Sequence, residues 1–298
     1  MIKYISLVIP PSDIRELRDL TRYRRKSTEA MSVEKNRVQK VLEDANIKIS
    51  SVVSDTFGVS GTAIIEALLA GELTTEEMSA LAVGKLRKKK NALHQALVGK
   101  ITEHHTFLIQ TSIGHIRSLE KLVTGIDKQI DEKLKPYQEE YELLQTIPGV
   151  KQHAAASIIA EIGVNMEQFP TADHLSSWAG MSPGNNESAG KKKAERTTHG
   201  SKALRATLTE SSWAASRTKN CYLKAKYHSL VGRRGKKRAL IAVGHNMLVM
   251  IYHILNHKIP YKERGIDYLD KRRKDKITKS YIKRLTALGF EVTIKEAA

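Results

Sequence analysis

The clearest pattern in the chain is a run of apolar residues spaced three or four positions apart between Ile109 and Leu144. Such spacing places apolar side chains along one face of an α-helix and is typical of a coiled-coil seam. Pro136 lies within the run, where its ring and its missing amide hydrogen should kink or split the helix. A seam of this length needs a partner helix, which is either residues 12–47 of the same chain or the same segment of a second chain.

The segment 12–47 itself predicts a second long helix. Pro10-Pro11 ends whatever precedes it, and Ser12 is a good N-cap. The apolar stripe of this helix is interrupted and its middle is highly charged, so the helix should protrude or pair with another helix.

Two short helices are predicted between the long ones. Ser60 is a candidate N-cap for the first, and Thr74 with Glu77 has the spacing of a capping box for the second, which should end near Arg87. The basic run 86–90 indicates a solvated helix end, where the helix dipole favours lysine.

Residues 143–163 predict two helices joined by a tight turn at Pro148-Gly149. The pattern matches a helix-hairpin-helix, whose backbone N–H groups can bind a nucleic-acid phosphate. Lys151 stands where the usual second glycine would be; it can contact a phosphate, but it weakens the case for close backbone approach. The alternative is an ordinary helical turn.

The remaining elements are predicted to be mostly helical. Thr171 should cap a helix that reaches Trp178, and residues 231–238 predict a basic loop that opens onto an apolar helix at 239–255. That apolar segment is slightly short for a membrane span and carries polar residues, so we expect a buried helix and no membrane association. The tail predicts a helix and a short strand, FEVTI, at 290–294. The expected fold class is mainly α, with minor β at the C-terminus.

Charge adds the first functional indication. The net charge is +18; residues 1–185 hold 23 Lys+Arg and 23 Asp+Glu, whereas residues 186–298 hold 27 and 9. This one-sided excess points to a polyanionic partner rather than to a solubility device. Cys221 is the single cysteine, so no internal disulfide can form, and a reducing, cytoplasmic location is expected.

The stretch 184–202, GNNESAGKKKAERTTHGSK, combines Ser188 and small residues with a basic run. Small neighbours allow a phosphate to approach, and cations can neutralise its charge while a serine hydroxyl attacks it. The same residues equally suit a loop that only binds phosphate, and a solvated helix cap is the alternative for the cluster at 233–238. The candidate DNA-binding residues are Gly149, Lys151, Lys191, Lys192, Lys193, Arg196, Lys202, Arg205, Arg233, Arg234, Lys236, Lys237 and Arg238.

Several blocks, among them IPPSDIRELRDLTRYRRK, TIPGV, FPTADHLSSWAGMSPGNNESAGKKK, RRGKKRALIAVGHNML and RLTALGFEVTI, make the chain similar to transposases of insertion-sequence family 110, the IS110/116/902 type related to Piv-type DNA invertases. The resemblance implies an N-terminal RNase H-like (RuvC-like) domain with a magnesium-binding Asp-Glu-Asp-Asp set, a coiled coil and a C-terminal transposase domain. It implies that Ser188 is the catalytic serine that attacks a DNA phosphodiester and holds a covalent intermediate. It also implies DNA and a structured guide RNA as partners, and a homo-oligomer formed through the coiled coil.

The resemblance begins near the end of the RNase H-like domain. We therefore expect residues 1–11 to be a remnant of that domain, 12–142 to be the coiled-coil region, and 143–298 to be the transposase domain. Residues of the first long helix such as Asp13 and Glu16 are not assigned to a metal; Mg²⁺ is expected only with the acidic domain. The chain should then bind DNA and oligomerise without completing transposition by itself. The alternative is a non-catalytic DNA-binding regulator or remnant that oligomerises with the full-length transposase.

Overall fold

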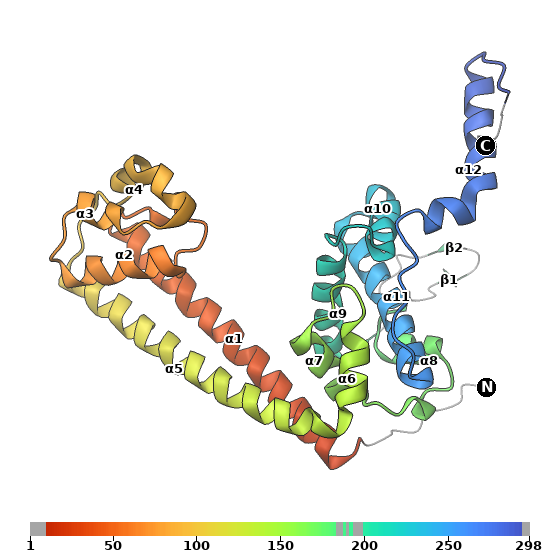
Figure 1. Ribbon diagram of the computed structural model, residues 1–298, viewed down its shortest axis with the longest axis horizontal. Coiled ribbons are helices and arrows are strands. Elements are labelled where there is room, and N and C mark those ends of the chain that lie inside the picture. The colour runs from red at the N-terminus through yellow and green to blue at the C-terminus, as the bar shows by residue number, and fades with distance from the viewer. Residues whose placement is uncertain (1–9, 183–186, 189–190, 193–198, 294–298) are drawn as a thin grey trace. The chain divides into compact units, whose positions relative to one another are not determined.

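The protein is mainly helical, as Figure 1 shows for a computed structural model of the chain. The residues that the structure describes are 10–182, 187–188, 191–192 and 199–293. They belong to two compact units, one of residues 22–129 and one that combines residues 1–21 with 130–298. Helices α1 (Ser12–Asp44) and α5 (Glu103–Leu134) contribute to both units. The predicted boundary at 142/143 lies inside helix α6 (Gln138–Gln145).

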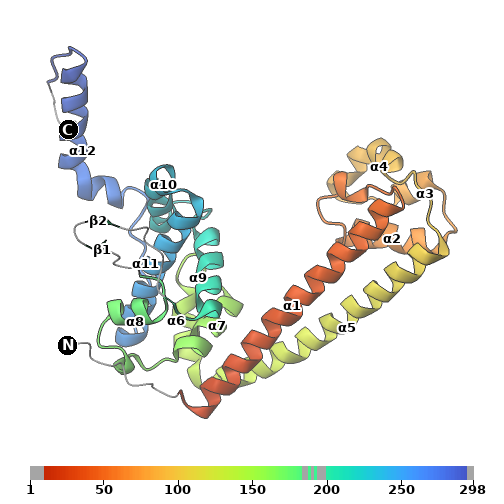
Figure 2. The same cartoon turned by 180° about the vertical axis from the view of Figure 1, so that it is seen from behind.

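The unit 22–129 is built on α1 and α5, which run antiparallel within it (Figure 2). Within this unit, two ion pairs join the helices, Arg24 Nε to Asp127 Oδ1 at 2.5 Å and His105 Nε2 to Asp44 Oδ2 at 3.0 Å. Short elements close one end of this unit: η1 (Ile49–Ser51), α2 (Val59–Ala70), α3 (Thr75–Ala80), η2 (Gly84–Lys89) and α4 (Lys90–Ala96).

The predicted apolar seam is buried within a single chain. In the unit 22–129, Ile109 and Ile116 of α5 share one hydrophobic core with Val38 and Leu42 of α1. The partner of the seam is therefore the segment 12–47, the first of the two predicted alternatives. Pairing through a second chain is not required to bury the seam, and oligomerisation stays a prediction.

The short helices confirm one predicted cap and correct another. The side chain of Thr74 accepts a hydrogen bond from the Glu77 amide, and Glu77 accepts one from the Thr74 amide, which completes the predicted capping box. The Ser60 prediction was wrong, because α2 begins at Val59 after Gly58. The Ser60 hydroxyl instead accepts a hydrogen bond from the Val83 amide at 3.0 Å, a contact between residues distant in sequence.

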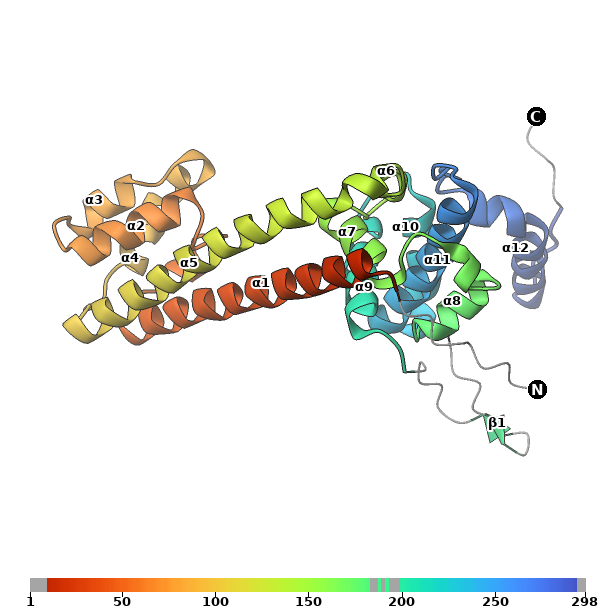
Figure 3. The same cartoon turned by 90° about the horizontal axis from the view of Figure 1, so that it is seen from below.

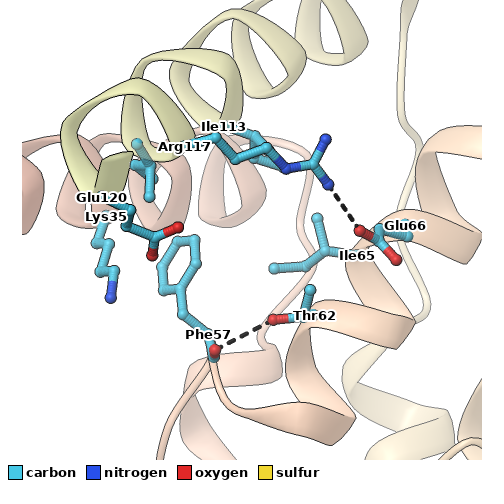
Figure 4. A pocket seen from close by; sticks show the side chains of 9 residues that line it. Lys35, Phe57, Thr62, Ile65, Glu66, Ile113, Arg117 and Glu120 are labelled. Carbon is cyan, nitrogen blue, oxygen red and sulfur yellow. Dashed lines mark hydrogen bonds and ion pairs between the residues drawn. The ribbon is translucent and has the colours of Figure 1, made fainter. Parts of the chain in front are cut away.

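Figure 4 shows a small pocket between α1, α2 and α5 in this unit. Its volume is about 100 Å³, and the Phe57 ring on its wall carries the Lys35 ammonium at 5.4 Å. Arg117 of α5 closes it by an ion pair to Glu66 of α2 at 2.9 Å. A space of this size is below the range of small-molecule sites, so we treat it as a gap in helix packing.

The other unit surrounds a long central helix, α11, which packs against α6, α8, α9 and α10 (Figures 1 and 3). Pro136 splits the seam as predicted, since α5 ends at Leu134 and a 3₁₀ turn precedes α6. The elements of this unit after α6 are α7 (Gln152–Ile162), η4 (Met166–Gln168), α8 (Ala172–Trp178), the strands β1 (Glu187–Ser188) and β2 (Lys191–Lys192), α9 (Lys202–Ala215), α10 (Tyr222–Arg234), α11 (Lys236–His257) and α12 (Tyr268–Ala287).

Helix α11 is the core helix that the sequence predicted. It is the one helix of the described chain with the length and apolar composition to cross a membrane, yet half of that apolar stretch is buried inside the unit. Val243, Met247 and Ile251 on its inner face are completely buried. Burial of this kind is typical of the central helix of a helical domain and does not indicate membrane insertion.

The predicted C-terminal strand is absent from the described residues. Helix α12 ends at Ala287, Gly289 follows with φ +89°, and residues 290–293 have no strand partner. Phe290 is 60% exposed, which shows that its side chain does not pack against an apolar surface. A strand needs a neighbour for its backbone hydrogen bonds, and none is supplied here. Residue 294 and, at the other end, residues 1–9 of the predicted remnant at 1–11 lie outside the described residues.

Candidate nucleic-acid interface

The segment that carries Ser188 leaves and re-enters the fold at a single point. After α8, Met181 donates its amide to Ser176 O at 2.9 Å and is buried. The chain returns at Gly200, where a Cβ atom would lie 2.3 Å from the carbonyl carbon of Ala179 and 2.4 Å from the Gly180 nitrogen. Only glycine allows this close approach of backbones, so the two ends of the segment lie together, and we call residues 181–200 the Ser188 loop.

The base of this loop is fixed against α9 and α11. A Cβ on Gly244 of α11 would lie 2.7 Å from Met181 Cε and 3.2 Å from Ser212 Oγ, so α11 carries glycine where Met181 packs. The Ser212 hydroxyl donates to Leu208 O at 2.6 Å and also contacts Met247 Sδ at 3.4 Å. The loop therefore starts from a buried and well-packed base.

Ser188 lies in a short antiparallel pair of strands within the loop. The register places Ser188 opposite Lys191 and Glu187 opposite Lys192. The backbone of the predicted nucleophile is thus directly beside the first lysine of the basic run. Two further predicted contacts, Lys193 and Arg196, lie outside the described residues.

The return of the loop is tied to α7 by a buried carboxylate. Ser201 caps α9, since its Oγ accepts a hydrogen bond from the Leu204 amide at 3.2 Å, and its hydroxyl donates to Glu161 Oε2 at 2.9 Å. Glu161 is 3% exposed. Lys202 follows on the exposed side of α9, and Arg205 is partly buried. The sequence analysis did not single out Glu161. A carboxylate in a largely apolar helix is unusual, and this could have indicated that it is buried and bonded.

Arg18 of α1 completes this link. Its guanidinium donates to the carbonyl oxygens of Ala160 and Glu161 at 2.9 and 3.0 Å. These two carbonyl groups lie in the last turn of α7, where the Glu161 side chain also accepts the hydrogen bond from Ser201.

Arg18→Met should lower the free energy of unfolding by about 1–3 kcal/mol, because two carbonyl acceptors lose their donor. Thermal denaturation checks this, with Arg15→Met at an exposed position of the same helix as the control. Equal melting midpoints for the two variants would contradict the prediction.

The predicted helix-hairpin-helix consists of α6, the turn 146–151 and α7. Gly149 has φ +88°, and a Cβ there would lie 2.2 Å from Ser211 O and 2.8 Å from Ala215 N of α9. The close backbone approach that the sequence suggested for DNA is thus made to α9. Lys151 is exposed at the start of α7, and phosphate contact by this turn stays a prediction.

The basic cluster at 233–238 corrects the sequence reading, which predicted a loop. Arg233 and Arg234 form the last turn of α10, Gly235 breaks the helix with φ +77°, and α11 begins at Lys236. All of these side chains, with Lys237 and Arg238, are exposed, and the first turn of α11 contains no acidic residue. The dipole of α10 favours Arg233 and Arg234 at its C-terminal end, whereas the cations in the first turn of α11 oppose the dipole of that helix, and an anion there would offset this.

His245 lies on α11 near the base of the loop. Burial lowers the pKa of its imidazole, an effect that the Asp173 carboxylate and a hydrogen bond with the Met181 backbone partly oppose. A lowered pKa keeps the ring neutral at physiological pH. This agrees with the packing role that its place in an apolar helix suggests.

The described residues do not fit a magnesium site. They contain no group of three or more His, Cys, Asp or Glu residues that could hold a metal ion. The acids at the start of α1 are used elsewhere, since Asp13 accepts a hydrogen bond from the Tyr137 hydroxyl and Glu16 pairs with Lys133.

The described residues of this unit are mainly helical, with exposed cations at two helix ends and a short strand pair in which Lys191 lies opposite Ser188. Exposed cations of this kind are typical of nucleic-acid-binding proteins. The comparison with known families makes this specific: residues 141–228, which include the Ser188 loop, match the model of the Transposase IS116/IS110/IS902 family. The match covers less than a third of the chain and supports, over residues 141–228, the resemblance to insertion-sequence transposases stated from the sequence. A search of curated proteins gave no match.

Proposed function

We propose that this chain acts on DNA by transesterification, with Ser188 as the nucleophile. The family match covers the Ser188 loop, and the strand register sets Ser188 beside Lys191. The serine oxygen loses its proton and forms a bond to phosphorus while the bond from phosphorus to one sugar oxygen breaks, and that oxygen gains a proton and leaves as a hydroxyl. The hydroxyl of another strand then loses its proton and attacks the phosphoserine ester, and the serine oxygen leaves and regains a proton, so the number of phosphodiester bonds is conserved.

The observation that carries the DNA-binding part is the cationic junction around Gly235. Five exposed cations lie on the ends of α10 and α11, and no acidic residue follows in the first turn of α11. Like charges held close together repel one another, and an anion that binds between them offsets this repulsion. A DNA phosphate supplies that anion, and phosphate contacts position a protein on DNA.

The same cationic junction equally supports a second function, a non-catalytic DNA-binding regulator or remnant that oligomerises with the full-length transposase. Both proposals require DNA binding, and only the first requires a covalent adduct. A structured guide RNA is a further proposed partner, on the strength of the family resemblance.

Binding to duplex DNA should be strongly salt-dependent. If about five cations contact phosphates, the affinity should fall by roughly 500-fold between 50 and 200 mM salt, since each contact releases counterions. Fluorescence anisotropy with a labelled duplex measures this. Arg233→Ala/Arg234→Ala should reduce the slope of log affinity against log salt by about two.

The matched control is Arg87→Ala/Lys88→Ala, which removes two exposed cations from η2 in the other unit. We expect this control to keep the wild-type slope. Equal slopes for the two double variants would show that the junction around Gly235 is not a contact surface. An affinity that does not change with salt would refute DNA binding by the cationic residues altogether.

A further inference from the structure

A groove of about 800 Å³ lies along the outer side of α11, between α10 and the segment that leads into α12. Asn246, Met250 and His253 of α11 form one wall, and residues 259–264 form another. Tyr222 and Tyr268 close one end. None of these residues belongs to the loop, the turn or the junction described above. A groove of this volume is within the range of sites that hold small planar ligands.

Several aromatic rings that line the groove contact one another. His253 and His257, one helical turn apart, stack with ring centroids 5.8 Å apart and an interplanar angle of 5°. Tyr222 and Tyr268 meet edge to face at 5.5 Å, and the Arg264 guanidinium lies over both rings at 5.8 and 5.1 Å. Both histidines are exposed, so their parallel stack offers a flat surface that a further ring can extend.

The polar groups of the groove indicate what kind of ring would bind. The amide nitrogen of Asn246 is buried and has no hydrogen-bond partner among the described residues. A buried donor without a partner is unfavourable, and an incoming acceptor would satisfy it. Asparagine amides are suited to the edges of nucleobases, which present acceptors and donors side by side.

The charge on the rim suits a phosphate. Lys262 and Arg264 are exposed there, whereas the one carboxylate between them, Glu263, is already bonded. It accepts hydrogen bonds from the amides of Tyr222 and Gly265, each at 2.9 Å, and from the Tyr261 hydroxyl at 3.2 Å. The rim therefore offers cations beside a flat aromatic floor, the combination that holds unpaired nucleotides.

We propose that this groove binds one or two unpaired nucleotides of a single-stranded nucleic acid, with bases on the His253–His257 stack and against Asn246. The inference rests on the proposed action on DNA, during which strands are cut and bases leave the duplex. An intact duplex does not fit, because its bases are already stacked on one another and the groove is too small for its width. Single-stranded DNA and single-stranded RNA share the same recognition chemistry here, and the experiment separates them.

The test uses the full chain and three labelled probes: dT12, rU12 and a duplex of similar length. Asn246→Leu and His257→Ala should each weaken binding of at least one single strand by about 5- to 100-fold, the effect of losing a stacking or edge contact to a base. Duplex affinity should stay within about two-fold. His104→Ala removes an exposed histidine from α5 in the other unit and should change neither. Loss for dT12 alone, for rU12 alone, or for both identifies DNA, RNA, or either as the bound strand.

Single-strand affinities that stay at the wild-type value in both variants, with duplex binding intact, would overturn the groove proposal and leave the proposed function standing. A wild-type chain that binds neither duplex nor single strands would overturn both. If instead the variants change the molar mass in light scattering but not single-strand affinity, the groove is a surface for another protein chain, and the proposal is wrong. Melting midpoints equal to wild type confirm that both variants are folded.

Discussion

Ser188→Ala should abolish covalent joining of the chain to DNA, reducing adduct yield by at least about a thousand-fold, while duplex affinity changes by less than about two-fold. Alanine has no nucleophilic oxygen, and at a strand position opposite Lys191 it preserves the backbone pairing. The positive charges that hold the phosphate remain in place, so binding should survive. End-labelled DNA carrying element ends, incubated with the protein and then denatured, shows the adduct as a band of reduced mobility.

Ser182→Ala is the matched control, because Ser182 lies at the start of the same loop, next to the buried Met181. We expect this variant to form adducts as the wild type does. An adduct that persists in Ser188→Ala would identify another nucleophile and refute the role assigned to Ser188. A wild-type chain that binds DNA and forms no adduct would favour the regulator over the enzyme.

The fold could be predicted wherever a local signal decided the structure. The capping box at Thr74 and Glu77, the cap at Thr171 and the break at Pro136 depend on residues within one or two turns of each other, and all three are present. The burial of α11 was also predictable, because a long apolar helix has few other solutions in a helical domain.

The predictions failed where a distant residue decided the outcome. Ser60 looked like a cap, but its hydroxyl accepts from the amide of Val83, which no local pattern reveals. The basic run at 233–238 was predicted as a loop, yet Arg233 and Arg234 end α10, Lys236 begins α11, and only Gly235 separates the two helices. Arginine and lysine are good helix formers, and packing between α10 and α11 adds stability that no local pattern reveals.

The residue types of the candidate site could be predicted from the sequence, but the contacts that hold the Ser188 loop in place could not. The sequence indicated Ser188 beside lysines, and the strand register sets Lys191 opposite it. It could not indicate that Gly200 crosses the chain at Ala179, or that Arg18 and Glu161 hold the return of the loop. These contacts join segments far apart in sequence, so they exist only in the folded chain.

Gly149→Ala should destabilise the C-terminal unit by about 3 kcal/mol or more, which corresponds to a fall of roughly 6–12 °C in melting midpoint. The new Cβ would lie 2.2 Å from Ser211 O and 2.8 Å from Ala215 N, both backbone atoms of α9 that cannot rotate away. The φ of +88° adds strain for any residue with a side chain. Differential scanning calorimetry measures the change.

Gly265→Ala separates the two causes, because Gly265 has φ +83° with no atom within 4 Å of the added Cβ. It should show the strain alone, about 1 kcal/mol, and the remaining loss in Gly149→Ala then belongs to the contact with α9. If Gly149→Ala were as stable as wild type but bound DNA weakly, the turn would owe its glycine to a phosphate, as the sequence pattern first suggested. If Gly149 is required for packing against α9, Gly149→Ala should instead lower the melting midpoint. Its DNA affinity should then fall only at temperatures where the unit unfolds.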